Sequence, residues 1–258
     1  MITLFTILAQ YGYYGNSYTT EATAGGYDFM TVIGFLLLAV TGIIGYAVQH
    51  ALQSSVRRNS SIPAPMTGAD TARLMLAQNG LTDVQVISTP GQLTDHYNPA
   101  NKTVNLSENV YNCATVTAMA VAAHECGHAV QHARAYPWLN MRSSLVPMVN
   151  MGSRLGQIVL MLGLFLVAMG GGTTVAWIGL ALFGTTTLFA LVTLPVEFDA
   201  SRRALAWLQS SGLADRAMHG QAGNALHCAA LTYVAAALSS IAMLVYYAFY
   251  LLSHSRRD

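Results

Sequence analysis

The chain has 258 residues, of which 53% are hydrophobic and only 9% are charged. This balance excludes an ordinary soluble globular protein, in which about 25% of residues are charged, and predicts a membrane protein. The net charge of +1 without a basic patch argues against a nucleic-acid partner, and three unpaired-looking cysteines argue against a disulfide framework.

The chain begins with a segment that we expect to lie outside the membrane. Residues 1–28 contain an apolar stretch that is too short to span a bilayer and then a region rich in Tyr, Gly and Thr, whose aromatic residues can lie at the membrane interface. No basic residue precedes the apolar stretch, so it lacks the charged start of a cleaved signal peptide. Residues 29–48 are 20 consecutive uncharged residues and predict the first transmembrane helix.

Residues 49–154 hold much of the polar sequence and predict a soluble catalytic part. Residues 67–79 have the pattern of an amphipathic helix. The alternation in residues 84–88 predicts a strand, and residues 92–98 and 102–106 predict two more strands joined by a turn. A free strand edge in such a unit can bind an extended peptide through main-chain hydrogen bonds.

A metal-binding motif follows this unit. His124 and His128 belong to the pattern H-E-x-x-H, so on a helix they lie on one face, one turn apart, and can bind the same zinc ion. Glu125 is rotated by roughly 100° from His124. Its carboxylate can therefore accept a proton from a water on the metal without binding the metal. Two unrelated histidines on a solvated helix are the alternative, but the small apolar residues 115–123 predict a buried, rigid helix.

Two further hydrophobic regions follow the motif. Residues 155–196 are 42 consecutive uncharged residues with three glycines at 170–172, and they predict a transmembrane hairpin over 155–195. Residues 229–252 predict a fourth span. The segment between the hairpin and this span, residues 196–228, would then lie on the same side as the motif.

Basic residues are distributed unequally between the two sides that four spans define. The side of the motif carries ten of the 12 Lys and Arg residues, and only Arg256 and Arg257 lie on the other side. Because basic loops are retained in the cytoplasm, we expect the motif to face the cytoplasm.

A catalytic zinc site usually has three protein ligands and a water, and three sources of the third ligand exist. His132 extends the motif, but on an unbroken helix it lies two turns from His124, so it is expected either to orient a ligand or to be simply a polar residue. Asp95 or His96 can approach from the strand pair, although no spacing requires it. Glu197 is the best candidate because it lies where the hydrophobic hairpin returns the chain to the side of the motif. An interfacial anchor is the alternative role for Glu197.

Five stretches of the chain resemble one known family. They are GQLTDHYNPANKTVNLSENVYN, VAAHECGHAVQHA, MRSSLVPMVNMGS, LPVEFDASRRALAWL and AALTYVAAALS, which together cover most of residues 65–250. Their combination resembles the YugP-like neutral zinc metallopeptidases of bacterial membranes. The resemblance implies a mostly α protein of the bacterial inner membrane, with about four transmembrane helices and a small α+β zincin core of the gluzincin type. Residues 1–28 lie outside the resemblance.

The resemblance also implies the members of the site. His124, His128 and Glu197 would bind one zinc ion per chain, and Glu125 would be the catalytic base. The implied substrate is a protein or peptide, and the lipid bilayer is the other partner.

The chain is similar, more distantly, to the HtpX-like and CAAX prenyl proteases, from which it departs at one position. Those families carry E-x-x-x-D on a later helix, and their Asp orients a metal-binding histidine. Here the residue four positions after Glu197 is Ser201, and Asp199 points to another face of the helix. Either Ser201 replaces that Asp or another group orients the histidine.

These residues together predict peptide-bond hydrolysis in membrane or membrane-adjacent proteins. An additional group normally stabilises the oxyanion, and the candidates are His96, Tyr97, His219 and His227, each of which more often has a structural role. A site-2-type intramembrane protease is one alternative, although its LDG-type motif is absent. A metal-binding scaffold or chaperone without turnover is another, against which the intact Glu125 argues. A zinc transporter would place ionisable ligands inside its spans, which contain none.

Overall fold

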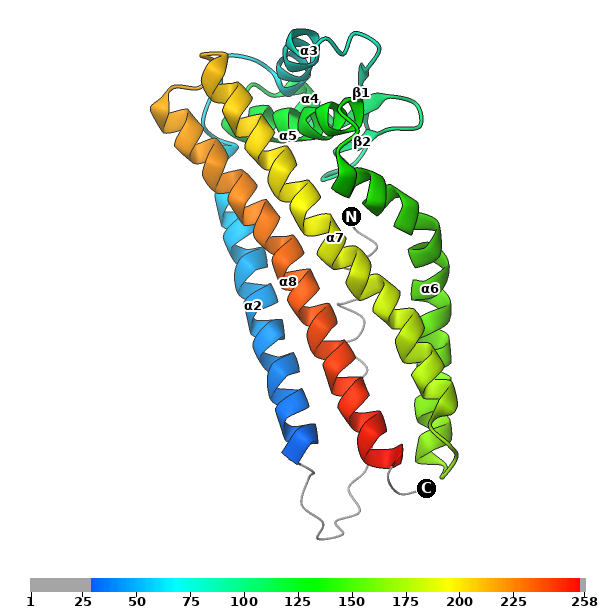
Figure 1. Ribbon diagram of the computed structural model, residues 1–258. Helices are drawn as coiled ribbons and strands as arrows, with labels where there is room; N and C mark the ends of the chain where they lie inside the picture. The colour runs from blue at the N-terminus through cyan, green and yellow to red at the C-terminus, as the bar shows by residue number, and fades with distance from the viewer. Residues whose placement is uncertain (1–28, 256–258) are drawn as a thin grey trace.

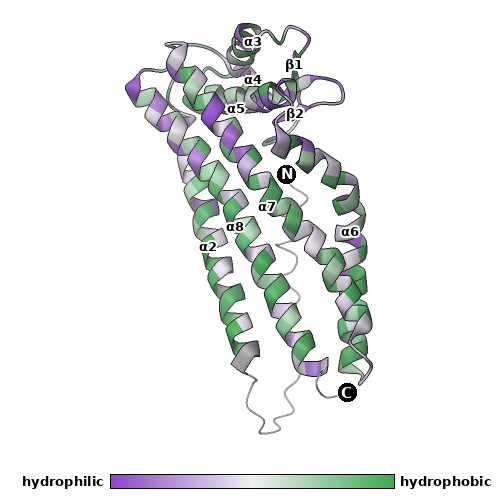
Figure 2. Cartoon of the chain, in the orientation of Figure 1, coloured by the Kyte–Doolittle hydropathy of each residue, from purple (hydrophilic) through white to green (hydrophobic). Residues whose placement is uncertain are grey.

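The computed structural model describes residues 29–255 and divides them into a bundle of long helices and a smaller head at one end of the bundle (Figure 1). The long helices are α2 (Phe29–Asn59), α6 (Pro137–Ala168), α7 (Thr174–Ser210) and α8 (Arg216–Ser255). All four are long and apolar enough to cross a membrane. Figure 2 shows apolar residues along the bundle and a higher density of polar residues at the head. The predicted fold class is therefore confirmed.

The long helices pack against one another in the order α2, α8, α7 and α6 (Figure 1). Small residues allow the close contact between α6 and α7. A Cβ atom added to Gly163 would lie 2.2 Å from the nitrogen of Ala176, and one added to Gly179 would lie 2.3 Å from the nitrogen of Leu160. Close backbone approach at small residues is a common way for helices to associate in a membrane.

The helices extend beyond the predicted spans. Helix α6 begins at Pro137, well before the predicted hairpin, and α7 continues through Pro195 to Ser210. Pro195 therefore lies inside α7 instead of ending it. The neighbouring helices α6 and α8 pack against α7, which is how a membrane helix can accommodate an internal proline. As a result, Glu197 lies on a continuous helix that projects from the bundle into the head.

The head contains the shorter elements. They are α3 (Gly68–Gln78), β1 (Gln85–Thr89), β2 (His96–Asn98), β3 (Thr103–Ser107), α4 (Glu108–Asn112) and α5 (Val116–Ala133). The sheet has the order β1-β3-β2, in which β1 is parallel and β2 antiparallel to the central β3. The predicted amphipathic helix, strand and strand pair all appear with slightly different bounds. The short strand β2 lies at one edge of the sheet.

Helix α5 carries the metal-binding motif through the middle of the head. Its first amide groups are capped by Thr115, whose hydroxyl accepts a hydrogen bond from the amide of Ala118 at 3.2 Å. The first half of α5 is almost completely buried, and Val116 and Met119 are among the most buried apolar side chains of the head. The core formed with α3 and α7 therefore fixes α5 before the motif begins.

Candidate metal centre

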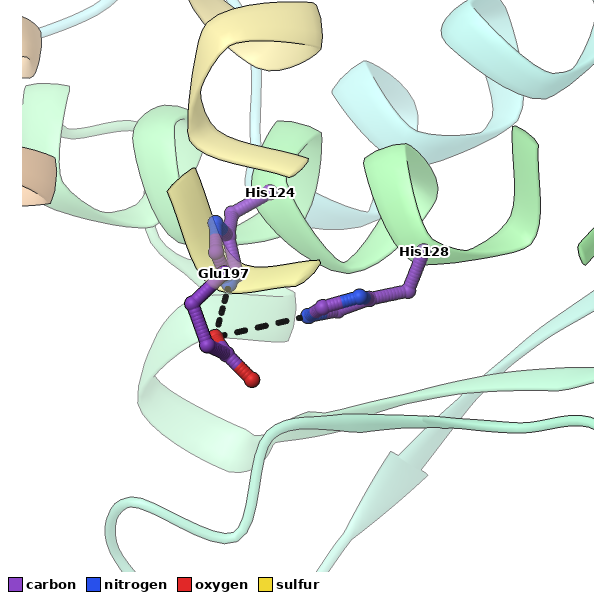
Figure 3. Close-up of side chains that lie close together, drawn as sticks. All are labelled: His124, His128 and Glu197. Carbon is purple, nitrogen blue, oxygen red and sulfur yellow. Dashed lines mark hydrogen bonds and ion pairs between the residues drawn. The ribbon is translucent and has the colours of Figure 1, made fainter. Parts of the chain in front are cut away.

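The two histidines of the motif project from the same face of α5 (Figure 3). Their ring centroids are 4.8 Å apart and the rings are nearly perpendicular. His128 is buried with 8% of its surface exposed, and the side chain of His124 is 14% exposed. The two histidines are therefore largely buried, but both keep a small surface that solvent can reach.

Glu197 reaches this pair from α7 (Figure 3). Its Oε2 lies 3.3 Å from Nε2 of His124 and 3.6 Å from Nε2 of His128, and the residue is only 2% exposed. One ligand atom from each of the three side chains lies within 4.8 Å of the other two. Among the residues that the structure describes, this is the one group of three or more His, Cys, Asp or Glu residues with metal-binding spacing.

Gly127 allows α5 and α7 to come close enough for these side chains to meet. It lies between the two histidines in sequence, and a Cβ atom added there would be 2.7 Å from the carbonyl oxygen of Ala200 and 3.1 Å from its Cα. A larger residue would collide with the backbone of α7 just after Glu197. The small residue inside the motif is therefore a requirement of the helix contact.

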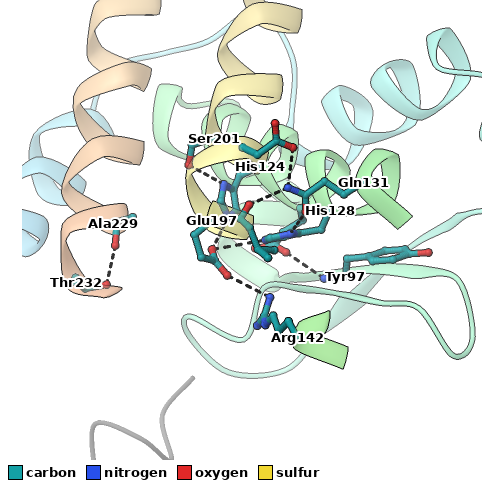
Figure 4. A network of polar contacts seen from close by, with 12 residues as sticks. Tyr97, His124, His128, Gln131, Arg142, Glu197, Ser201, Ala229 and Thr232 are labelled. Carbon is teal, nitrogen blue, oxygen red and sulfur yellow. Dashed lines mark hydrogen bonds and ion pairs between the residues drawn. The ribbon is translucent and has the colours of Figure 1, made fainter. Parts of the chain in front are cut away.

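Each histidine is oriented through its other ring nitrogen (Figure 4). Nδ1 of His124 lies 3.1 Å from the hydroxyl of Ser201, and Nδ1 of His128 lies 3.0 Å from Oε1 of Gln131. Gln131 is fully buried, and its Nε2 donates to the carbonyl of Val196 and to Asp199. Because the amide nitrogen has these two acceptors, Oε1 faces Nδ1–H of His128. The lone pair on Nε2 of His128 then points toward Glu197.

This set of donors fits zinc. Two imidazoles and one glutamate are the ligands of a known class of catalytic zinc sites, which keeps its fourth position open for water. The contacts at both Nδ1 atoms leave both Nε2 atoms directed at the same place as Glu197 Oε2. A metal ion there would also neutralise the charge of a glutamate that is otherwise almost completely buried.

Glu125 follows His124 on α5, and its carboxylate contacts the edge strand β2. Its Oε2 accepts a hydrogen bond from the amide of Tyr97 on β2 at 3.0 Å (Figure 4). Burial raises the pKa of Glu125 to about 7; His124 opposes this shift, and Glu197 and Asp95 add to it. A carboxylate with such a pKa can both accept and donate a proton near neutral pH.

Arg142 is a member of the site that sequence reasoning did not identify. It lies on α6, and its Nη1 is 3.3 Å from Oε1 of Glu197, the carboxylate oxygen that faces away from the histidines (Figure 4). Its guanidinium carbon also lies 6.0 Å from the centroid of the Phe189 ring on α7. Its signals in the sequence were its charge in a weakly charged region after the motif and its place in MRSSLVPMVNMGS, one of the stretches that carry the family resemblance.

The remaining predicted residues lie near the site without joining the three-residue group. Asp95 is buried and accepts hydrogen bonds from the amide and hydroxyl of Ser107, and burial raises the pKa of its carboxyl group. His96 is exposed and contacts the carbonyl of Thr94 in its own loop. His132 contacts Tyr97 instead of approaching the metal position.

The residues on the later helices have equally distinct surroundings. Asp199 is bound by Gln131, Arg202 and Arg203, so it contacts the site only through Gln131. Nε2 of His219 lies 3.2 Å from the carbonyl oxygen of Leu205. His227 is exposed on α8.

Comparisons with known proteins identify the family of the chain. A family model described as "Putative neutral zinc metallopeptidase" matches residues 34–252, a range that includes the whole site. The chain is 40% identical over 209 residues to "Putative membrane protease YugP" of Bacillus subtilis (strain 168), which covers 80% of this chain and 91% of the relative. No solved structure matches the chain.

Proposed function

The chain belongs to the neutral zinc metallopeptidase family, and from this we propose a specific activity: it is an endopeptidase that hydrolyses peptide bonds of membrane or membrane-adjacent proteins at a site facing the cytoplasm. The observation that carries the proposal is the convergence of His124, His128 and Glu197, with ligand atoms within 4.8 Å of one another, beside the buried Glu125. One zinc ion per chain would bind to these three ligands.

Each residue of the site has a defined task in this proposal. Bound zinc supplies Lewis-acid polarisation of a carbonyl group and lowers the pKa of water to about 7. Glu125 accepts the proton of the attacking water and passes it to the leaving amine. Because Oε2 of Glu125 is held by the Tyr97 amide, Oε1 is the oxygen that carries this proton. Ser201 and Gln131 hold the ligand histidines in orientation.

The position of the site supports a substrate at or near the membrane. Glu197 follows Pro195 closely on a helix whose preceding residues belong to a candidate span, and Arg142 lies near the start of the adjacent span α6. A peptide bond that reaches Glu125 must therefore approach the end of the helix bundle from which α7 enters the head. Segments that flank transmembrane helices meet this requirement most directly.

The distribution of basic residues supports a site that faces the cytoplasm. Ten of the 12 Lys and Arg residues lie in residues 49–154 and 196–228, which include the head and the ends of the long helices next to it. Short segments with such an excess of basic residues are retained on the cytoplasmic side of a membrane.

Two observations favour this function over its alternatives. Helix α5 is not among the four described helices that are long and apolar enough to span a membrane, so the metal motif lies outside the bilayer in this proposal, unlike that of an intramembrane protease. Glu125 is buried, directed by a backbone amide and free of any role as a ligand in the three-residue group. A metal-binding scaffold without turnover has no use for a carboxylate held in this way.

Cleavage of an unstructured protein tests the proposal. Detergent-purified protein is incubated with casein before chelation, after removal of metal by a chelator, and after zinc is restored. We expect internal fragments of casein to appear, to stop appearing after chelation, and to return with zinc. Cleavage that persists after complete removal of the metal, or trimming of only single residues from the ends, would contradict a zinc endopeptidase.

A further inference from the structure

We propose that Tyr97 and His132 form a positioning pair that fixes the edge strand β2 against α5 and thereby holds the base Glu125 in its working orientation. The inference rests on the proposed peptidase function, because it assigns Glu125 the role of base. The inference assigns a role to His132, the third histidine of the H-E-x-x-H-x-x-x-H row. Neither residue touches the metal position, so both would act through Glu125.

The first link joins the side chains of the pair. Oη of Tyr97 lies 2.8 Å from Nδ1 of His132, and the two ring centroids are 5.8 Å apart. Both side chains are partly buried, so water competes less for this hydrogen bond than it would at an exposed site. His132 lies near the end of α5, two turns beyond His124. The hydrogen bond therefore fastens β2 to the helix that carries the metal motif.

The second link joins the backbone of the same residue to the base. The amide of Tyr97 donates to Oε2 of Glu125 at 3.0 Å. A carboxylate turns readily about its terminal torsion unless a neighbour holds one of its oxygens. With Oε2 held by this amide, Oε1 is left for proton transfer. The position of the Tyr97 backbone thus decides the orientation of the base.

Strand β2 needs such a fastening because its own sheet contacts are few. It is three residues long and pairs only with β3, with Tyr97 opposite Val104. The other edge of β2 has no strand beside it in the described part of the chain. Short edge strands contribute little pairing energy. A side-chain hydrogen bond to α5 is therefore a large share of the interactions that hold β2 in place.

The three histidines of the row on α5 have two different kinds of partner. His124 and His128 direct their Nε2 atoms at Glu197, whereas His132 directs Nδ1 at Tyr97. A second strand-to-helix contact therefore sits just beyond the metal ligands. A purely structural contact would stabilise the head without affecting turnover, and the following experiment separates the two possibilities.

Four variants test the pair: Tyr97→Phe, His132→Ala, the double variant, and His132→Asn, in which an amide oxygen can replace Nδ1 as acceptor. Tyr97→Phe keeps the backbone amide that contacts Glu125. Gln92→Ala is the control, because Gln92 is an exposed residue of the loop that precedes β2. Zinc content, kcat and KM for casein cleavage, and hydrogen exchange of the backbone amides of residues 94–98 are measured for each variant.

We expect kcat to fall about tenfold in Tyr97→Phe and in His132→Ala, with KM and zinc content unchanged. The double variant should lose no more than either single variant, because both remove the same hydrogen bond. His132→Asn should recover most of kcat, and Gln92→Ala should match the wild type. Amides of β2 should exchange faster in the first three variants.

Two results would overturn the inference. One is a kcat equal to that of the wild type in the single variants while exchange of the β2 amides becomes faster, because the contact would then be only structural. The other is exchange that does not change in Tyr97→Phe or His132→Ala, which would show that the pair does not hold the strand. The exchange measurement does not depend on turnover, so failure of the wild type to cleave casein would count against the proposed function, whereas unchanged exchange would count against the contact between the pair and the strand.

Discussion

Arg142 on α6 and Glu197 on α7 form an ion pair in which Nη1 lies 3.3 Å from Oε1. The other carboxylate oxygen of Glu197, Oε2, faces both histidines. The two oxygens therefore have separate partners, and the guanidinium keeps Glu197 from turning Oε1 toward the metal position. Through this pair, the helix that follows the metal motif supports the glutamate that we propose as the third ligand.

Removal of this guanidinium should weaken zinc binding. In Arg142→Gln we expect the zinc dissociation constant to rise about tenfold, the lower end of the usual effect of losing a group that orients a ligand. Arg142→Lys should lose less, because it keeps the charge but not the planar fork. Competition with a chromophoric chelator measures the affinity. Arg58→Gln, which removes an exposed charge at the end of α2, is the control, and an equal affinity in Arg142→Gln and Arg58→Gln would contradict the role of the pair.

Ser201 should orient His124 as the Asp does in the E-x-x-x-D families that the chain resembles. Its hydroxyl lies 3.1 Å from Nδ1 of His124. Ser201→Ala should weaken zinc binding about tenfold, and Ser201→Asp should retain or improve it, because a carboxylate makes the imidazole a better ligand. Ser210→Ala is the control on the same helix, since Ser210 is exposed and its hydroxyl donates to the carbonyl of Trp207. Equal affinities of Ser201→Ala and Ser210→Ala would refute the assignment.

Gly127→Ala should damage both stability and the metal centre. The added Cβ would lie 2.7 Å from the carbonyl oxygen of Ala200, so α5 and α7 must separate, which costs about 1–3 kcal/mol. We expect a lower midpoint of thermal unfolding and weaker zinc binding. Gly220→Ala is the matched control, because this exposed helical glycine has no atom within 4 Å of the added Cβ. That variant should be stabilised by up to about 1 kcal/mol. A Gly127→Ala variant as stable as Gly220→Ala would contradict the close contact.

The orientation of the head can be measured with the chain's own cysteines. Cys113 is exposed in the head, Cys126 is buried, and Cys228 lies on α8. In a Cys228→Ser background, a membrane-impermeant maleimide should label Cys113 only after bacterial cells are permeabilised. A second variant combines Cys113→Ser and Cys228→Ser with Gly172→Cys. The new cysteine should be labelled in intact cells, because residue 172 lies in the turn between α6 and α7 at the end of the bundle opposite the head. The reverse pattern of labelling would place the site outside the cytoplasm.

The parts of the site that local geometry controls could be predicted from the sequence. The shared face of His124 and His128 follows from helical spacing alone, and the structure has them on one face of α5. The strand pair around Pro99 and the long apolar helices followed from local patterns as well. The helices nevertheless extend further than the uncharged runs, because packing against neighbours continues a helix into polar sequence where hydropathy gives no signal.

The supporting contacts could not be predicted in this way. Arg142 and Glu197 are 55 residues apart in sequence, and Gln131 and Val196 are 65 residues apart. No pattern in one chain specifies which polar side chains meet across such distances. Gln131 even lies inside the motif stretch, yet only the packing of α5 on α7 reveals that it joins His128 to the helix of Glu197.

The central claim is that Glu125 is the base of a zinc site formed by His124, His128 and Glu197. The most direct measurement determines zinc content and casein cleavage together for the wild type, Glu125→Gln and Glu197→Ala. We predict about one zinc ion per chain and active cleavage in the wild type. Glu125→Gln should keep its zinc and lose at least about a hundredfold in rate, and Glu197→Ala should lose its zinc. A Glu125→Gln variant that cleaves casein at the wild-type rate, or a Glu197→Ala variant that keeps full zinc, would contradict the account.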